Sequence, residues 1–483
     1  MNIRFVLYIL GVLLLLEGGL MALPGVVALL YGEHDLLLML LCSSALTFAV
    51  GGTLWWLNRG CSRMTGKREG FIIVGFVWVL FAFFGSLPFV FSGYAPSMTD
   101  AFFEAISGFT TTGATIIPDI EALPRGLLFW RALMHFTGGI GILVLCIAVL
   151  PIFGIGSMTI YQAETSTAAA GSGKFTPRIK TTAKQIFIIY LILTAACFLF
   201  YLPDMSIFDA VCHAFSTTAT GGFSTKTASM GAYSVYTQYV TTVFMLLGST
   251  PFVLFFYLWK GELKKVVQYD EFRFYLLIIF IAFAIICVGL LFSGHGAERS
   301  VRESLFNVVS IFSTTGYAIN DYMQWSPPLW FIIFLIAVVG GCAGSTTGGL
   351  KVVRLLVLLR TIPVQFKKIM HPNAVIHVKI NRQNISEDRI FRTFAFFMIF
   401  ICVFIVGVLA FLLCGLNFTS AVGASVACLS NSGPGLDMVG PATNFAHFSA
   451  AGKWACSFLM LLGRLELYPA LILFSPAFWR VGN

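Results

Sequence analysis

The sequence predicts an all-α polytopic membrane protein with about ten transmembrane helices, and two observations support this: its composition and a fourfold internal repeat. The chain has 483 residues, of which 58% are hydrophobic and only 11% are charged, and its mean hydropathy is +0.89. A hydrocarbon core about 30 Å thick requires roughly 20 apolar residues per helix. Runs of this kind are expected at Phe5–Leu30, Leu36–Leu57, Gly70–Phe91, Leu127–Phe153, Gln185–Leu202, Tyr236–Leu258, Phe274–Leu291, Pro328–Leu358, Ile390–Leu413 and Lys453–Phe478.

The charged residues predict how these helices are oriented. The net charge is +9, but the basic residues do not gather in one patch, which argues against binding of nucleic acid. Both termini are expected in the cytoplasm, because the positive-inside rule places there the segments that carry most Lys and Arg. These segments are Arg59–Arg68, Lys174–Lys184, Lys260–Arg273 and Lys351–Arg392. Acidic residues in the opposite loops would concentrate cations near a pore mouth, or could simply be solvated loop charges.

Four short segments between the long apolar runs align in one ungapped frame. They are Asp100–Thr115, Asp209–Ser224, Glu303–Ala318 and Ser420–Gly435. Offsets of 109, 203 and 320 residues bring Gly222, Gly316 and Gly433 onto Gly113. The first copy (FFEAISGFTTTGA) and the third (LFNVVSIFSTTGY) are the most alike, and the fourth (VGASVACLSNSGP) is the most divergent. One Thr-Thr-Gly stretch alone could be an ordinary turn, but four copies in one frame favour a repeated structure.

Each copy has about ten mostly apolar residues, then a Thr/Ser-rich stretch, then Gly. Ten helical residues rise about 15 Å, half the hydrocarbon thickness, so the helix enters the membrane without crossing it. Non-helical backbone is tolerated there only if it is buried in protein or lines a water-filled path. We therefore expect four loops around one axis, where helix C-termini favour a cation and glycines let carbonyls turn inward. Rings of such carbonyls replace the hydration shell of K⁺, and the absence of Asp and Glu from the filters favours a monovalent ion.

The run Pro328–Leu358 is interrupted by a glycine-rich stretch. Each Gly costs about 1 kcal/mol relative to Ala in a helix, so this stretch is expected to form an internal loop that lines a cavity. The stretch contains Gly340, Gly341, Gly344, Ser345, Thr346, Thr347, Gly348 and Gly349. Arg464, an ionisable residue inside the last run with Glu466 close by, is a functional candidate by default. The alternative is a structural ion pair between Arg464 and Glu466.

The order and spacing of these motifs resemble the Trk/Ktr/HKT superfamily of K⁺ transporters, and most closely its bacterial TrkH/TrkG-type membrane subunits. The resemblance covers nearly the whole chain. It rests on FTTTGAT (Phe109–Thr115), ATGGFST (Ala219–Thr225), STTGY (Ser313–Tyr317), NSGPG (Asn431–Gly435), GGCAGSTTGGLK (Gly340–Lys351), HPNAV (His371–Val375) and GRLE (Gly463–Glu466). It implies four helix–pore-loop–helix repeats around one central pore, preceded by an N-terminal helix pair. The implied units are residues 1–69 (helix pair), 70–154, 155–265, 266–365 (with the intramembrane loop) and 366–483.

The resemblance also implies the residues of the pore. Backbone carbonyls at and before each filter glycine would coordinate K⁺, and Gly113, where some Na⁺-conducting relatives have Ser, favours K⁺. The implied filter residues are Thr110, Thr111, Thr112, Gly113, Thr220, Gly221, Gly222, Thr314, Thr315, Gly316, Asn431, Ser432 and Gly433. The implied gate is the loop from Gly340 to Gly349 with Lys351 and Arg464. The coordinating atoms of the fourth filter stay open, because it departs from the Thr-rich pattern.

By the same resemblance, the protein is expected to take up K⁺ across a bacterial inner membrane, as a channel or as a symporter. It would form a homodimer and dock a TrkA/KtrA-like nucleotide-binding regulatory subunit on its cytoplasmic face. Gly171–Lys174 is similar to part of a P-loop, but that pattern requires Gly at position 168 and Ser or Thr at position 175, where this chain has Ala168 and Phe175. This chain itself is therefore not expected to bind nucleotide. A Na⁺ or ammonium pathway of the same fold is the alternative. An intramembrane enzyme is a third hypothesis, but His135 has no evident Ser, Cys or Asp partner in the sequence.

Overall fold

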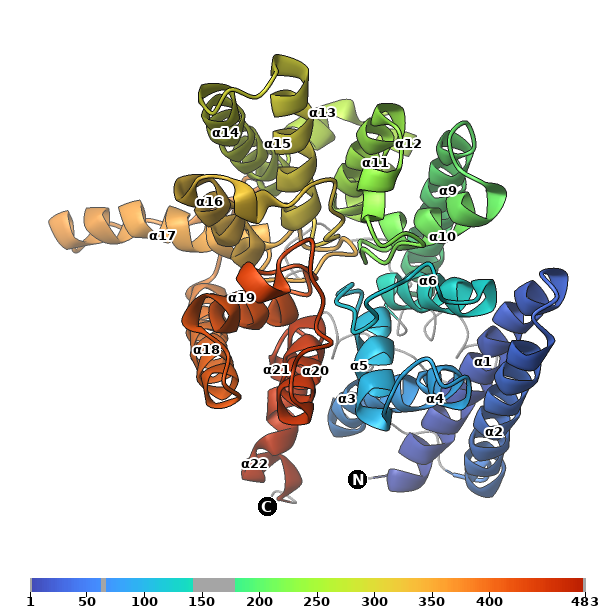
Figure 1. The fold of residues 1–483 in the computed structure, drawn as a ribbon. Helices are drawn as coiled ribbons and strands as arrows, with labels where there is room; N and C mark the ends of the chain where they lie inside the picture. Colours follow the sequence, from blue (N-terminus) through green and yellow to red (C-terminus); the bar gives the residue numbers. More distant parts are fainter. Residues whose placement is uncertain (1, 62–66, 142–178, 481–483) are drawn as a thin grey trace.

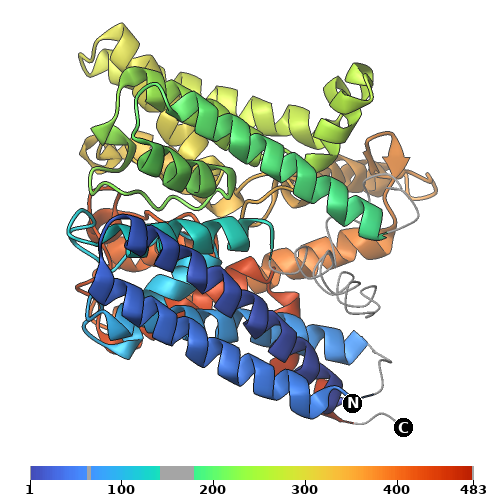
Figure 2. The same cartoon turned by 90° about the vertical axis from the view of Figure 1, so that its right-hand side faces the viewer.

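The computed structural model describes residues 2–61, 67–141 and 179–480, and this part of the chain is mostly helical. Figure 1 shows the helices gathered in groups around one centre, and Figure 2 shows the long helices running between two ends of the molecule. The predicted run Leu127–Phe153 and the predicted cytoplasmic segment Lys174–Lys184 lie partly outside the described residues. The prediction of a helical polytopic membrane protein is confirmed.

The first two helices form the predicted N-terminal pair. They are α1 (Ile3–Leu30) and α2 (His34–Asn58), which lie side by side at one edge of the molecule (Figures 1 and 2). Their approach is close: a Cβ on Gly11 would lie 2.6 Å from the backbone nitrogen of Trp55. Small residues at such contacts let two apolar helices pack tightly without a hydrophobic driving force between them.

Six helical segments among the described residues are long and apolar enough to cross a membrane, and eight if each of two bent pairs counts as one span. After the N-terminal pair, these segments include α3 (Lys67–Gly85) with α4 (Leu87–Phe91), α9 (Ile179–Tyr201), α14 (Asp270–Phe292) and α18 (Glu387–Leu413). The predicted run Leu127–Phe153 begins as α6 (Arg125–Gly139). The predicted run Pro328–Leu358 is divided between α16 (Pro327–Val339) and α17 (Val352–Met370).

Two runs that hydropathy shows as single spans are bent. The first consists of α11 (Val235–Gly248) and α12 (Phe252–Trp259), which meet at 93°. The second consists of α20 (Ala450–Arg464), followed after a 116° bend by α21 (Tyr468–Leu471) and the 3₁₀ helix η6 (Ile472–Phe474). Pro251 precedes α12, and a proline that lacks a backbone N–H favours such a break.

The four pore helices are α5 (Met98–Phe109), α10 (Ile207–Thr218), α15 (Ala297–Phe312) and α19 (Phe418–Leu429). In Figure 1 they surround the centre of the molecule. Three of them begin at an N-cap that satisfies one orphan backbone N–H: Ser97, Ser206 and Asn417 each accept a hydrogen bond from the residue three positions on. Each of the four helices ends within two residues of its filter segment.

The apolar core is divided between two large clusters. One joins the N-terminal pair with the first and fourth repeats, and it includes Phe5, Trp78, Phe103, Phe411 and Met460. The other joins the second and third repeats. The polar filter segments lie where these two halves meet.

A small hairpin follows α17 in the segment that the sequence places in the cytoplasm. Its strands β1 (Lys379–Ile380) and β2 (Gln383–Asn384) pair antiparallel, with Lys379 opposite Asn384. Asp270 at the start of α14 fixes the hairpin, because its carboxylate accepts hydrogen bonds from the backbone N–H of Asn381 and from Arg360, at 2.8 and 2.7 Å. The remaining short elements are α13 (Leu263–Val267), α22 (Pro476–Trp479), η3 (Ser229–Ala232), η4 (Tyr322–Gln324) and η5 (Asp437–Val439).

Candidate functional site: a fourfold filter with a loop against its base

The four pore helices end at equivalent positions of the common frame. Their last residues are Phe109, Thr218, Phe312 and Leu429, which are separated by the same offsets as the filter glycines. The chain then makes the same turn in each repeat. The backbone N–H at the position of Thr112 donates to the carbonyl at the position of Ser107, over 2.9 Å in repeats 1 to 3 and 3.0 Å in repeat 4.

The backbone angles of the four filters also agree. The residue two positions before each filter glycine has a φ between 52° and 54°, and the glycines themselves have a φ between 77° and 85°. The first set is Thr111, Thr220, Thr314 and Asn431, and the second is Gly113, Gly222, Gly316 and Gly433. Left-handed angles cost about 1–3 kcal/mol at a non-glycine residue and persist only where the surrounding structure enforces them. Alternation of left-handed residues with others turns successive carbonyls toward one side of the chain.

The filters pack against one another in a closed ring. A Cβ on Gly113 would overlap the carbonyl oxygen of Gly221, and one on Gly222 would overlap that of Thr315. In the same way Gly316 abuts the carbonyl of Ser432, and Gly433 abuts the carbonyl of Thr112, which returns to the first repeat. The four carbonyls occupy one position of the common frame. A cavity of about 90 Å³ is lined by all four glycines, so they share one central space.

Side chains behind the filters differ between repeats. In repeats 1 and 3 the hydroxyls of two filter residues are paired at 2.8 Å, Thr110 with Thr112 and Ser313 with Thr315. In repeat 4 the amide of Asn431 donates to the Thr112 hydroxyl and to the Met460 carbonyl, both at 2.9 Å. The divergent fourth filter is therefore attached by its side chain to the first.

The glycine-rich stretch forms a loop that is closed at its base. Helix α16 ends at Val339 and is followed by Gly340, whose φ is +71°, and α17 begins after Lys351, whose φ is +74°. The N–H of Lys351 donates to the carbonyl of Val339 over 2.8 Å, and the N–H of Val352 donates to that of Gly341 over 3.0 Å. The interruption expected from the sequence is thus an ordered loop between two helices.

This loop lies against the C-terminal ends of three pore helices. The Thr346 hydroxyl bonds the Thr218 carbonyl (3.3 Å) and the Thr220 hydroxyl (3.1 Å) of repeat 2. The N–H of Gly348 donates to the Thr314 hydroxyl of repeat 3 over 3.0 Å. A Cβ on Gly348 would lie 2.5 Å from the Ser430 carbonyl of repeat 4. The loop therefore occupies the space below the filters.

Arg464 joins this loop to the remaining repeat. Its Nη1 donates to the Thr346 carbonyl over 2.9 Å and to the Thr111 hydroxyl over 3.1 Å, and its Nη2 donates to the Gly138 carbonyl. Glu466, the alternative partner considered from the sequence, instead forms an ion pair with Arg354. Lys351 Nζ donates within the loop to the Thr347 carbonyl.

Sequence reasoning missed three buried charged residues around the filters and the loop. Glu271 of α14 accepts a hydrogen bond from the backbone N–H of Ala343 in the loop, over 2.6 Å. Glu104 of α5 and Arg131 of α6 form an ion pair at 2.8 Å, with their side chains 0% and 1% exposed. Arg131 lies inside a predicted apolar run, so the rule that intramembrane charges mark function could have found it.

His135 does have a polar neighbour that the sequence did not reveal. Its Nδ1 is 2.8 Å from the Ser216 hydroxyl, and its ring is stacked on Phe223 with 4.1 Å between centroids. A Cβ on Gly221 would overlap the imidazole, so His135 packs directly behind the second filter. The histidine is fully buried, and its Nε2 has no hydrogen-bond partner among the described residues. Through these contacts with Ser216, Phe223 and Gly221, His135 supports the second filter from behind.

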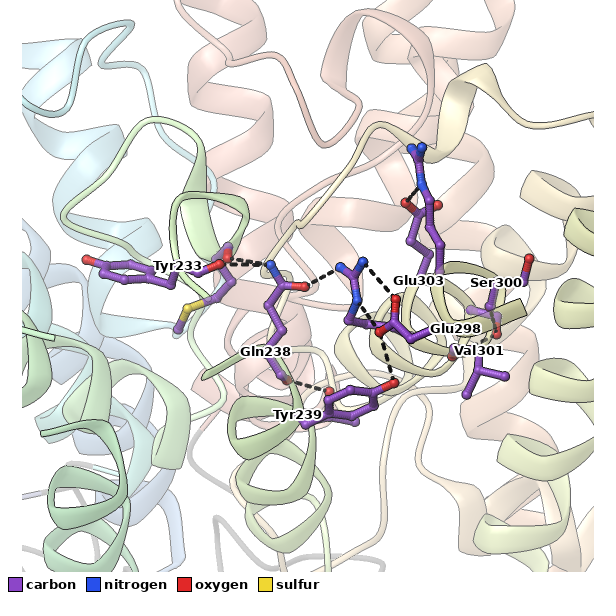
Figure 3. Close-up of polar contacts among 12 residues, drawn as sticks. Tyr233, Gln238, Tyr239, Glu298, Ser300, Val301 and Glu303 are labelled. Carbon is purple, nitrogen blue, oxygen red and sulfur yellow. Dashed lines mark hydrogen bonds and ion pairs between the residues drawn. The ribbon is translucent and has the colours of Figure 1, made fainter. Parts of the chain in front are cut away.

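A polar network of side chains joins α11 to α15. The Gln238 side chain donates to the carbonyl of Tyr233 over 3.1 Å and accepts from Arg302 over 2.6 Å. Arg302 in turn pairs with Glu298 at 2.8 Å. Figure 3 shows Gln238 between Tyr233 and the charged pair, with Tyr239 close to Glu298. The network connects the third pore helix to the loop that follows the second filter.

Known proteins resemble this chain both in sequence and in structure. Residues 40–481 match the family model described as TrkH, cation transport protein. The chain is 39% identical to the Trk system potassium uptake protein TrkH of Salmonella typhimurium, over 99% of this chain and 100% of the relative. It is 35% identical to the Trk system potassium uptake protein TrkG of Escherichia coli K12, over 99% of each. The crystal structure of the potassium transporter TrkH from Vibrio parahaemolyticus is similar, with a TM-score of 0.88 and 36% identity, over 99% of this chain and 100% of that one.

Proposed function

The chain belongs to the TrkH family of cation transport proteins, and we propose that it takes up K⁺ through the ring of four filters. The observation that carries this proposal is the ring closure: four carbonyls at one frame position, each packed against the glycine of the preceding repeat. Carbonyl rings of this kind replace the hydration shell of K⁺. The relatives named as potassium uptake proteins support the same ion.

In this proposal K⁺ is coordinated by backbone carbonyls and not by side-chain charge. The coordinating segments are Thr110–Gly113, Thr220–Gly222, Thr314–Gly316 and Asn431–Gly433. The C-termini of four pore helices point toward the same region, where their partial negative charge favours a cation. A cation of the wrong size gains less from a ring whose dimensions are fixed by four interlocked contacts.

The loop from Gly340 to Lys351 is the proposed gate. Its contacts with the second, third and fourth filters, together with the Arg464 bridge to the first, support a closed position. Opening requires Arg464 to release the Thr346 carbonyl or to move with it. The residues of this gate are those expected from the sequence, with Glu271 added as a second anchor.

We also propose that both termini are cytoplasmic, that the membrane is the bacterial inner membrane, and that the chain forms a homodimer regulated by a TrkA/KtrA-like subunit. The hairpin β1–β2 and the basic segment around it offer a folded surface for such a subunit. Helix α17, which projects from the outline in Figure 1, exposes Ile362, Phe366 and Ile369, as a dimer contact would require. Co-purification with the regulatory subunit and cross-linking of α17 test these two interfaces. The division into repeats at 70–154, 155–265, 266–365 and 366–483 stays a prediction.

Flux measurements on the purified protein in liposomes test the proposal. With and without a regulatory subunit, uptake of K⁺ and Rb⁺ is expected to exceed uptake of Na⁺ and ammonium. Equal uptake of Na⁺ would favour the alternative pathway of the same fold. A protein that carries no cation, even with the regulatory subunit added, contradicts the proposal.

A further inference from the structure

The Glu104–Arg131 ion pair connects the exits of two filters. Glu104 is on the pore helix α5, and its carboxylate accepts hydrogen bonds from the Thr115 hydroxyl and from the backbone N–H of Ile116, both over 3.0 Å. Thr115 and Ile116 follow directly after the first filter. The carboxylate therefore fixes the chain where it leaves Gly113.

Arg131 extends this connection to the second filter. Its Nη1 donates to the Ser224 carbonyl over 3.2 Å, and its guanidinium lies 4.0 Å from the centroid of the Phe223 ring. Its Nη2 is 3.4 Å from the Thr115 hydroxyl. One planar guanidinium thus contacts Glu104 and the exits of two different filters, a geometry that Lys does not reproduce.

The frame position that Glu104 occupies in repeat 1 holds a different type of residue in each of the other three repeats. Its equivalents are His213, Asn307 and Ala424, and the equivalents of Thr115 are Ser224, Ala318 and Gly435. In repeat 2 the His213 Nε2 is 2.9 Å from the Ser224 hydroxyl, the same connection made by neutral groups. Asn307 instead donates to Asn320, over 2.7 Å, and Ala424 has no polar side chain. Support of the filter exit is therefore strongest in repeat 1, where it is an ion pair.

Arg131 also lines the cavity that contains the four filter glycines. A guanidinium at this place would repel cations, and Glu104 compensates its charge at 2.8 Å. Both side chains are almost completely buried, where water screens such a charge poorly. The charge of the pair that lies nearest the filter glycines is therefore that of Arg131, and Glu104 neutralises it from behind.

We infer that Glu104 and Arg131 are positioning residues that fix the exits of the first and second filters and keep the mouth of the pathway neutral, and that they thereby set the preference for K⁺ over Na⁺. This inference rests on the proposed function. It assigns part of the selectivity to charged residues outside the filter, whereas the proposed function assigns it to the carbonyl ring alone.

The test compares Glu104→Gln, Arg131→Lys and the double variant Glu104→Gln/Arg131→Gln in liposomes. Glu104→Gln leaves the guanidinium uncompensated, and K⁺ flux is expected to fall about tenfold or more. The double variant removes that charge, so flux is expected to recover at least partly while the K⁺/Na⁺ flux ratio stays reduced. Arg131→Lys keeps the charge but loses the planar contacts, so its K⁺/Na⁺ flux ratio is expected to fall about threefold or more, with a K⁺ flux above that of Glu104→Gln.

Asp388→Asn is the control, because it removes one charge from an exposed ion pair with Arg392 on α18, outside the pore helices and filters. Its K⁺/Na⁺ ratio is expected to be that of the wild type. Should Glu104→Gln fail to fold, Thr115→Val removes the hydroxyl that both charged residues contact, and it is expected to lower the ratio without changing any charge.

The outcomes separate the two proposals. A wild-type ratio in Arg131→Lys, in the double variant and in Thr115→Val, with only the melting temperature lowered, would show a purely structural pair and overturn this inference while leaving K⁺ uptake intact. A wild-type protein without K⁺-selective flux would overturn both.

Discussion

The filter ring and the loop below it are held in opposite ways. The features that define the ring occur four times and belong to the backbone: the turn after the pore helix, the left-handed residue, and the glycine against the next carbonyl. The loop occurs once; backbone bonds close its base, and single side chains such as Arg464, Thr346 and Glu271 attach it to the surrounding helices. A selective ring has to keep one geometry on four sides, whereas a gate has to be released by a small change in free energy. Substitutions should therefore damage the ring and loosen the loop.

The largest expected effect is that of Gly222→Ala. The new Cβ would overlap the Thr315 carbonyl, at a residue whose φ is +85°. Because overlap and left-handed strain each cost on the order of 1–3 kcal/mol, K⁺ flux is expected to fall by roughly 100-fold or more. Gly344→Ala is the matched control, since Gly344 has φ +74° but nothing within 4 Å. Similar flux in the two variants would remove the distinction between the two regions.

Arg464→Gln should have the next largest effect, in the opposite direction. The change removes the charged hydrogen bonds to the Thr346 carbonyl and to the Thr111 hydroxyl. Such bonds contribute about 1.5–3 kcal/mol each, so even the net loss of one from the closed position should raise flux without a regulatory subunit about tenfold. The K⁺/Na⁺ ratio should not change. Arg360→Gln, which breaks a pair with Asp270 at the hairpin, is the control. A lowered ratio in Arg464→Gln would assign this arginine to the filter instead of the gate.

Thr346→Val should produce a smaller increase. The variant keeps the volume of the side chain but loses its hydrogen bonds to Thr218 and Thr220. Neutral hydrogen bonds contribute about 0.5–1.5 kcal/mol each, and flux is expected to rise about threefold. Thr361→Val removes a hydroxyl that bonds only within α17, to the Val357 carbonyl, and should leave flux unchanged. Reduced flux in Thr346→Val would mean that the loop supports the pathway and does not obstruct it.

Asp204→Asn changes a residue outside both regions and is expected to have the smallest effect. Hydrogen bonds from Thr237 and Ser234 hold the pKa of the Asp204 carboxyl below its ordinary value. Because the folded pKa is lowered, this contribution to stability is present above the unfolded pKa of about 3.9 and is lost as the pH falls through the folded pKa. Asp204→Asn should lower the melting temperature by about 1–2 °C at pH 7 and leave flux unchanged. The two proteins should melt alike once the pH is below the folded pKa of Asp204. A larger difference in acid than at pH 7 would reverse the sign of this effect.

The sequence predicted the repeated part of the molecule well because repetition amplifies a weak signal. The frame that aligns Gly113 with Gly222, Gly316 and Gly433 also predicts where the pore helices end. It could not predict left-handed angles at Thr111, Thr220 and Thr314, since β-branched Thr disfavours that region and the surrounding structure enforces it.

The parts that occur once were harder to predict. Hydropathy predicted one span for α11 with α12 and one for α20 with α21. Both pairs are bent, and hydropathy does not reveal a bend when the segments on both sides of it are apolar. The loop was expected from its glycines, but its partners on distant helices were not. Glu104 and Arg131 are 27 residues apart, and nothing in their local sequence shows that they meet.

Ion density within the ring tests the central claim most directly. Crystals of this protein grown with Rb⁺ in place of K⁺ should give an anomalous difference peak on the axis, surrounded by the carbonyls of Thr112, Gly221, Thr315 and Ser432. The peak should disappear when Rb⁺ is replaced by Na⁺. A ring without an ion in Rb⁺, or one equally occupied in Na⁺, would contradict the account.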